Sequence, residues 1–211
     1  MATDRKRTLG VVLFPKFELL DVFGPLEMFG KLKETAKEMI DVVVVAEHAG
    51  AVASAQGPAA VADRGFADCP RLDLLLVPGG IGTRKEVDNP VLIEWLRARA
   101  SDAEIAMTVC TGAALLARTG ALDGRQATTN KRAFAWVAEQ GPKVQWIKQA
   151  RWVEDGKFVT SSGVSAGIDM ALAVIARLGG QALSEELATA AEYDWHRDPR
   201  WDPFAKVHGL V

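Results

Sequence analysis

Cys110 is the residue in this sequence whose surroundings best suit it to chemistry. The apolar run Ile105–Val109 predicts a buried strand that stops at Cys110, and Thr111–Ala117 predicts the first turns of a helix with Thr111 as N-cap. A thiol at that junction faces unpaired backbone N–H groups and the positive end of the helix dipole, which both favour the thiolate. The sequence therefore predicts a nucleophile elbow whose cysteine has a lowered pKa.

The alternative is an inert structural cysteine, because Cys is among the residue types most often buried. Two further features favour the reactive interpretation. Asp21 follows the first predicted strand, and Pro78-Gly79-Gly80 directly follows the third. In open α/β sheets, active sites lie beyond the carboxyl ends of the strands. We therefore expect Asp21 and the two glycines to lie close to Cys110.

The elements that would position these residues alternate between apolar strands and helices, which predicts an α/β fold with a mostly parallel sheet. No internal repeat or linker interrupts the pattern, so we expect a single domain. The predicted strands are Thr8–Phe14, Ile40–Ala46, Leu72–Val77 and Ile105–Val109, with Gly124–Thr129 returning to the sheet and hairpins within Val52–Ala62 and Gln149–Ser161. The predicted helices are Val22–Lys37, Asn89–Ala100, Arg132–Glu139, Ser165–Leu178 and Ser184–Ala191.

The composition is that of an ordinary globular protein. The 211 residues are 49% hydrophobic and 25% charged, with a formal net charge of −2, so nothing indicates a nucleic-acid or membrane partner. Its two cysteines, Cys69 and Cys110, suggest neither a disulfide framework nor a metal cluster. The first apolar run is too short for a signal peptide or a membrane span, so we expect a cytoplasmic protein.

Three motifs resemble the DJ-1/PfpI superfamily: VPGG at Val77–Gly80, TVCTGAALLARTGALDGRQATT at Thr108–Thr129 and SGVSAGIDMAL at Ser162–Leu172. The second motif resembles the branch that contains isocyanide (isonitrile) hydratases and the amidase-like domains of some transcription regulators. The resemblance implies a flavodoxin-like three-layer sandwich, a homodimer, and one domain over residues 1–211 with a flexible segment 1–7.

The resemblance also assigns roles to individual residues. Cys110 corresponds to the nucleophile, and Asp21 corresponds to the acidic partner that hydrogen-bonds the reactive sulfur. Gly79 and Gly80 resemble the backbone donors that face the cysteine. Thr111 resembles the threonine that follows the nucleophile in the hydratase branch. These roles imply a hydratase that uses neither a cofactor nor a metal ion.

The histidines favour hydration over hydrolysis. The protease-like branches carry His directly after the cysteine, where this chain has Thr111, and many hydratase-like sequences carry His where this chain has Asn130. A Cys-His-acid hydrolase needs an imidazole base, and among His48, His196 and His208 we consider only His196 as a candidate. Isocyanide hydration needs one nucleophile and one protonated carboxyl group, and burial beside the sulfur would keep Asp21 protonated.

Other interpretations remain open at this stage. Asp21 also suits a helix N-cap, and Asp169, within a helical apolar run, needs a buried partner. Cys110 could serve a non-enzymatic redox sensor, or the fold could sense a ligand for a regulator, although we expect no helix-turn-helix module after Val211. A glyoxalase- or amidase-like activity is a further alternative.

Overall fold

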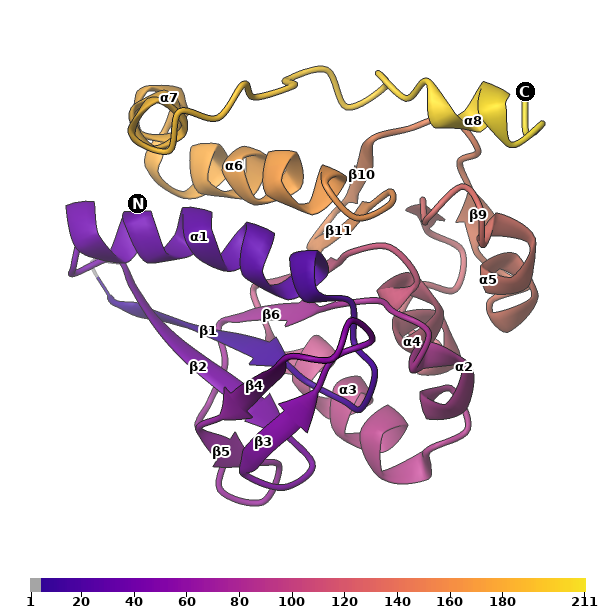
Figure 1. Ribbon diagram of the computed structural model, residues 1–211, viewed down its shortest axis with the longest axis horizontal. Coiled ribbons are helices and arrows are strands. Elements are labelled where there is room, and N and C mark those ends of the chain that lie inside the picture. Colours follow the sequence, from indigo (N-terminus) through magenta and orange to yellow (C-terminus); the bar gives the residue numbers. More distant parts are fainter. Residues whose placement is uncertain (1–4) are drawn as a thin grey trace.

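The computed structural model describes residues 5–211 (Figure 1). Of the segment 1–7 that we expected to be flexible, residues 1–4 lie outside the described residues. Arg5 instead pairs with Asp73 and Glu104, at 2.5 and 3.2 Å, and Arg7 lies in the first strand. The N-terminal end of the described chain is therefore tied to the sheet.

Within the described residues, seven strands form the central sheet in the order β10-β11-β7-β6-β1-β2-β5. All neighbours are parallel except β10 and β11, which form an antiparallel hairpin. The middle strands β6 and β7 are buried along their whole length because both faces of the sheet are covered. The strands are β1 (Arg7–Val12), β2 (Ile40–Ala46), β5 (Arg64–Gly65), β6 (Leu74–Val77), β7 (Ile105–Thr108), β10 (Trp152–Asp155) and β11 (Phe158–Ser161).

Two short ribbons stand apart from this sheet. The predicted hairpin within Val52–Ala62 is confirmed as β3 (Gly50–Ala53) paired with β4 (Ala59–Ala62). The expected return of Gly124–Thr129 to the sheet is wrong, because β8 (Gln126–Ala127) pairs with β9 (Gln145–Trp146) instead. The reason is that both edges of β7 are already occupied, by β6 and β11.

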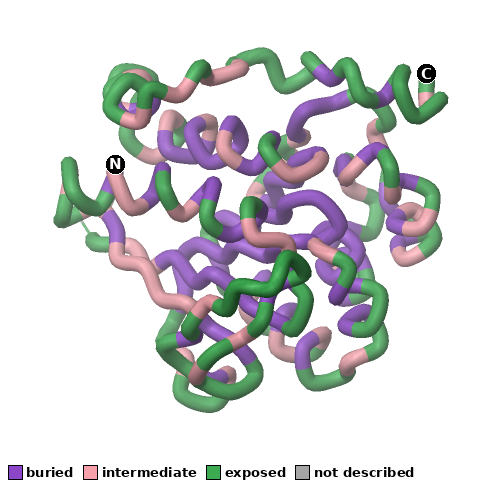
Figure 2. The backbone as a smooth tube through the Cα atoms, viewed as in Figure 1, coloured by how far each residue is buried: buried purple, intermediate pink, exposed green. Residues whose placement is uncertain are grey.

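Helices cover both faces of the sheet, which gives the three layers of a flavodoxin-like fold (Figure 1). The chain is buried along the sheet and on the helix surfaces that face it, whereas the outer loops are exposed (Figure 2). On one face lie α1 (Leu19–Thr35), α6 (Ala166–Gly179) and α7 (Gln181–Ala190), and on the other lie α2 (Thr83–Glu86), α3 (Pro90–Asp102) and α4 (Gly112–Arg118). At the end of the molecule lie α5 (Phe134–Gln140) and α8 (Phe204–Val207).

The strand order places a topological switch between β1 and β6, since the chain proceeds from β1 to β2 on one side and later from β6 to β7 on the other. Loops that leave the carboxyl ends of β1, β6 and β7 therefore meet at one edge of the sheet.

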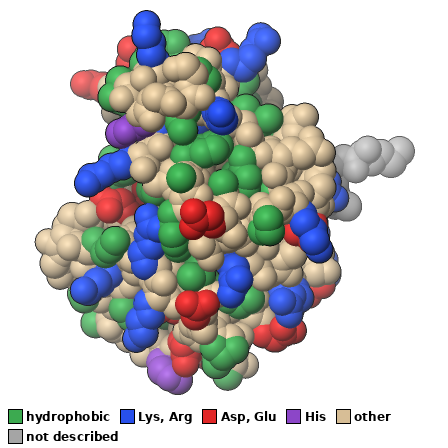
Figure 3. Space-filling model, turned by 90° about the vertical axis from the view of Figure 1, so that its right-hand side faces the viewer, with side chains coloured by type: hydrophobic (Ala, Val, Ile, Leu, Met, Phe, Trp, Pro, Cys, Tyr) green, Lys and Arg blue, Asp and Glu red, His purple; other side chains and the backbone are tan. Residues whose placement is uncertain are grey.

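On the face shown in Figure 3, acidic and basic side chains are interspersed. No helix within residues 5–211 is both long enough and apolar enough to cross a bilayer.

Candidate active site

Cys110 lies at the sharp turn between β7 and α4, as predicted. Its φ of 55° is unusual for a residue other than glycine, so surrounding contacts must hold it in place. Its N–H donates to the Ser162 carbonyl at 3.0 Å, and its carbonyl accepts from Thr129 Oγ1 at 2.8 Å. The side chain is buried, with 6% of the residue exposed. This is the geometry of a nucleophile elbow.

Asp21 reaches Cys110 from the first turn of α1. The Gly79 N–H donates to its Oδ2 at 2.8 Å. Its Oδ1 is buried without a hydrogen-bond partner among the described residues, and the Cys110 side chain is close enough to the carboxyl group to lower its pKa. The alternative that Asp21 is a helix N-cap is wrong. Glu18 holds the cap position, and the Asp21 side chain turns inward.

Burial shifts both groups of this pair in the same direction. It raises the pKa of Asp21 well above its ordinary value, although hydrogen bonds from Gly79 and Cys110 oppose the shift. Burial also raises the pKa of the Cys110 thiol, and any negative charge on Asp21 raises it further. The expectation of a lowered cysteine pKa is therefore wrong, because the depth of the site outweighs the helix N-terminus. Burial therefore favours the protonated form of both groups.

The sulfur has backbone donors, but they are not the expected ones. Hydrogen bonds from the N–H groups of Thr111 and Val164 lower the pKa of Cys110. The Gly79 N–H is used by Asp21, and the Gly80 N–H donates to Thr111 Oγ1 at 3.0 Å. The two glycines thus hold the side chains that surround the sulfur instead of facing it with free N–H groups.

Thr111 follows the nucleophile and connects it to the loop after β6. It occupies the N-cap position of α4, but its side chain makes no capping bond. Its hydroxyl lies 3.0 Å from the Gly80 nitrogen and 3.1 Å from Thr83 Oγ1. The predicted N-cap position of Thr111 is therefore confirmed, but its hydroxyl is committed to the loop that positions Gly79 and Gly80.

The loop after β6 requires glycine for reasons of space and conformation. A Cβ on Gly79 would lie 2.5 Å from the Thr111 nitrogen and 2.9 Å from Asp21 Oδ2, so any side chain would separate the groups that build the site. Gly80 has a φ of +121°, and a Cβ there would lie 2.5 Å from the Glu18 nitrogen. The motif that follows β6 thus allows β1, β6 and β7 to bring their loops together.

Two residues near the sulfur were missed in the sequence. Val164, with a φ of 28°, lies in the loop that follows β11. Arg84, at the start of α2, lies over the Trp136 ring at 3.4 Å, and the charge of Cys110 raises its pKa although burial lowers it more. Both residues could have been predicted from their positions in the sequence. They follow β6 and β11, and the loops after these strands leave the sheet at the same edge as Cys110.

Other candidate residues do not join the site. His48 is exposed, and His196 stacks on Trp201 at 4.1 Å in the C-terminal segment. Asn130 accepts from the Ala133 N–H at 3.0 Å, and its amide lies against Gly163, so it is a turn residue before α5 that borders the site. The buried partner that Asp169 requires is Arg151, at 2.5 Å. These side chains have structural contacts of their own.

No group of three or more His, Cys, Asp or Glu side chains within residues 5–211 is arranged to hold a metal ion. The chemistry that the described site offers is that of a sulfur nucleophile beside a carboxyl group of raised pKa, with two backbone donors and a nearby guanidinium.

Comparison with known proteins identifies the family. Residues 7–177 match the DJ-1/PfpI family, and the chain therefore belongs to it. A THiJ/PfpI family protein from Pseudomonas syringae has the same fold, with a TM-score of 0.82 and 28% identity over 97% of this chain and 84% of that one.

The curated relatives differ in function. Isonitrile hydratase of Pseudomonas putida is 31% identical over 185 residues, which cover 88% of this chain and 78% of the hydratase. The HTH-type transcriptional regulator GbdR of Pseudomonas aeruginosa is 28% identical over 191 residues, which cover 89% of this chain and 51% of the regulator. The chain thus spans about half the length of that regulator.

Proposed function

We propose that this DJ-1/PfpI-family chain is a cysteine-dependent hydratase that adds water to a small isocyanide and releases an N-substituted formamide. The observation that carries the proposal is the buried Asp21–Cys110 pair, in which a sulfur nucleophile lies beside a carboxyl group whose pKa is raised by burial. The likeness to isonitrile hydratase supports the same reaction. Thr111, which stands where a hydrolase would need His, also supports hydration over hydrolysis.

In the first step, the Cys110 sulfur bonds to the terminal isocyanide carbon. Asp21 gives its proton to that carbon and takes up the thiol proton, so the pair starts with two protons and ends with one. The product is a thioimidate, R–N=CH–S–Cys110. The N–H groups of Thr111 and Val164, which hydrogen-bond the sulfur, stabilise the negative charge that develops on it.

In the second step, water adds across the C=N bond of the thioimidate. Its oxygen bonds to carbon and one of its protons goes to nitrogen, which gives R–NH–CH(OH)–S–Cys110. The C–S bond then breaks, the hydroxyl proton returns to the sulfur, and the formamide R–NH–CHO leaves. Asp21 is the group that can relay these protons. The cycle restores the thiol and the carboxyl group.

The test is a panel of alkyl and aryl isocyanides with the purified protein, with formamide formation followed by NMR. We expect turnover by the wild type and none by Cys110→Ser. Cys69→Ser is the matched control, because Cys69 is the second free cysteine, and this variant should retain wild-type turnover. Absence of turnover with every isocyanide, or full activity of Cys110→Ser, would rule the hydratase out.

A second candidate is a domain that senses a ligand without turning it over, and the likeness to GbdR favours it. The same panel separates the two, because a sensor would bind without forming product. A redox sensor is less well supported, because a buried thiol with a raised pKa reacts slowly with peroxide.

We further propose that the hydratase is a homodimer that acts in the cytoplasm without a cofactor. Leu20 and Phe23 of α1 remain 41% and 47% exposed, which favours an interface on that helix. Light scattering after size-exclusion chromatography would measure the mass. A monomer at micromolar concentration would contradict this part of the proposal.

A further inference from the structure

The backbone of Cys110 is held on both sides by residues from outside its own strand and helix. A residue other than glycine at a φ of 55° is strained, and such a conformation persists only where surrounding contacts over-determine it. The Cys110 N–H donates to the Ser162 carbonyl at 3.0 Å, and Thr129 Oγ1 donates to the Cys110 carbonyl at 2.8 Å. Ser162 and Thr129 both lie in loops. Contacts that fix these two loops therefore also fix the turn that carries the sulfur.

The loop at Ser162 is tied to the C-terminal segment. The Ser162 N–H donates to the Arg151 carbonyl at 2.8 Å, and the Arg151 N–H donates to the Pro199 carbonyl at 2.6 Å. A chain of backbone hydrogen bonds thus leads from the Cys110 N–H to Pro199. The family match ends at residue 177, so Pro199 lies beyond it.

The loop at Thr129 is tied to the same segment by a buried ion pair. The side chains of Lys131 and Asp202 are only 1% and 2% exposed, and Lys131 Nζ lies 3.1 Å from Asp202 Oδ2. Lys131 Nζ also donates to Thr128 Oγ1 at 2.6 Å, and Asp202 Oδ1 accepts from the Phe204 N–H at 2.9 Å. Burial lowers the pKa of Lys131, and the charge of Asp202 opposes that shift. Asp202 thus holds the loop that supports the Cys110 carbonyl.

The segment after α7 depends on side-chain anchors for its position. Residues 191–203 contain neither helix nor strand, and in Figure 1 they run along α6 toward α8. Tyr193 and His196 anchor the first part of the segment at Asp169. Asp202 is the buried acid that anchors its second part.

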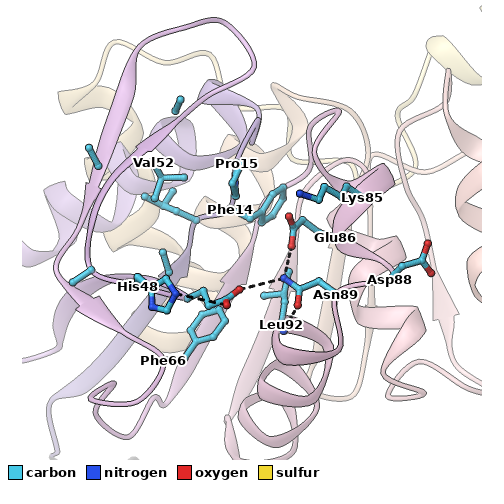
Figure 4. Close-up of a pocket in the computed structure, with 16 residues that line it drawn as sticks. Phe14, Pro15, His48, Val52, Phe66, Lys85, Glu86, Asp88, Asn89 and Leu92 are labelled. Carbon is cyan, nitrogen blue, oxygen red and sulfur yellow. Dashed lines mark hydrogen bonds and ion pairs between the residues drawn. The ribbon is translucent and has the colours of Figure 1, made fainter.

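The cleft shown in Figure 4 does not open onto the sulfur. It has a volume of about 830 Å³ and lies between the β3–β4 hairpin and the helices α2 and α3, and none of the residues placed around Cys110 line it. Cys110 itself is only 6% exposed. The rate at which a small reagent reaches the sulfur therefore reports on the turn at Cys110 and on the two loops that support it.

We propose that Asp202 is a positioning residue for Cys110. Its ion pair with Lys131, together with the contact at Pro199, holds the two loops that support the strained turn. The C-terminal segment thereby keeps the sulfur buried beside Asp21. The inference rests on the proposed function only for the role of Cys110 as the nucleophile, and it is tested without an isocyanide.

Alkylation of the full chain by iodoacetamide tests the proposal, in a Cys69→Ser background so that only Cys110 is labelled. We expect Asp202→Asn to loosen the turn and to raise the alkylation rate at pH 8 by about tenfold, the effect of lowering the thiol pKa by one unit. The pH profile of the rate should shift in the same direction, because a more exposed thiol has a lower pKa. An unchanged rate and pH profile in Asp202→Asn would overturn the proposal.

Asp73→Asn is the matched control for lost stability. Asp73 is also 2% exposed and pairs with Arg5 at 2.5 Å, but it precedes β6 and so lies at the opposite end of the sheet from Cys110. This variant should lower the free energy of unfolding in urea, yet it should keep the wild-type alkylation rate. Equal acceleration in Asp73→Asn and Asp202→Asn would overturn the proposal, because the faster alkylation would then follow from lost stability alone.

Thr129→Val removes only the last hydrogen bond of the path from Asp202. It should raise the alkylation rate by itself, and Asp202→Asn should add little to it in the double variant, because both changes act on the same path. Lys131→Met takes the place of Asp202→Asn if that variant fails to fold, and it should give the same result. Effects that multiply independently in the double variant would overturn the proposal.

Discussion

Asp21 and Asp169 are both fully buried carboxyl groups on neighbouring helices, α1 and α6, but their surroundings differ. Asp21 has one N–H donor and the Cys110 thiol. Asp169 has an ion pair with Arg151, the Tyr193 hydroxyl at 3.1 Å and the His196 N–H at 3.0 Å. Burial raises the pKa of both carboxyl groups, but Arg151, Tyr193 and the His196 N–H oppose the shift at Asp169, whereas only Gly79 and Cys110 oppose it at Asp21.

The two environments also serve different parts of the chain. The donors to Asp169 come from the hairpin at the edge of the sheet and from the segment after α7, so the carboxylate fastens that segment to α6. Asp21 holds only the Gly79 loop, and its second oxygen is buried without a hydrogen-bond partner among the described residues. We infer that full pairing identifies a structural acid and incomplete pairing a reactive one.

The largest expected effect is the loss of stability in Asp169→Asn. Removing this charge leaves the buried Arg151 guanidinium without its partner, and breaking a buried pair typically costs about 3–5 kcal/mol. Urea denaturation should show that loss, while turnover per folded molecule stays near wild type. The control is Asp123→Asn, which breaks an exposed pair with Lys143 and should cost less than about 1 kcal/mol. A small loss in Asp169→Asn would contradict the structural assignment.

The opposite pattern is expected for Asp21→Asn. The amide keeps the Gly79 contact and the shape of the side chain but cannot transfer a proton, so isocyanide turnover should fall by about a hundredfold or more. That is about 2.7 kcal/mol in the activation free energy. Circular dichroism should show an unchanged fold, and iodoacetamide should still alkylate Cys110. Near wild-type turnover in Asp21→Asn would show that Asp21 is not the acid.

The same contrast explains how much the sequence predicts. The strand Ile40–Ala46 was predicted with its exact bounds, because a short run of valines strongly favours a buried strand over a helix or a loop. Cys110 and Asp21 were found because both follow strands that end at one sheet edge. The thiol pKa was predicted with the wrong sign, because local sequence reveals the helix N-terminus but not the depth of burial. The donor role of Val164 depends on β11 lying beside β7, which only the tertiary structure establishes.

A smaller effect concerns the pH dependence of stability. Because the pKa of Asp21 is raised on folding, the native state keeps a proton that the unfolded chain releases above its ordinary pKa of 3.8. The contribution of Asp21 to the free energy of unfolding is complete below pH 3.8. It falls as the pH rises, by at most about 1.4 kcal/mol per pH unit. Between pH 5 and 7, Asp21→Asn should therefore gain stability relative to wild type. Parallel curves in urea denaturation would mean that the native Asp21 is already ionised.

The smallest effect separates the donors around Asp169. Tyr193→Phe removes one hydroxyl donor but leaves Arg151 and the His196 N–H in place, so the carboxylate remains paired. Because Tyr193 is only partly buried, we expect the free energy of unfolding to fall by about 1 kcal/mol, the usual net value of a hydrogen bond.

Burial and the charge of Asp169 also raise the pKa of Tyr193 to about 12. Absorbance titration of the phenolate measures this pKa directly, because the chain has a single tyrosine. In Asp169→Asn the phenol should titrate at a lower pH than in wild type. A phenol that ionises at its ordinary pH in wild type would show that the segment after α7 is not held against α6, and the distinction between the two buried acids would then rest on Arg151 alone.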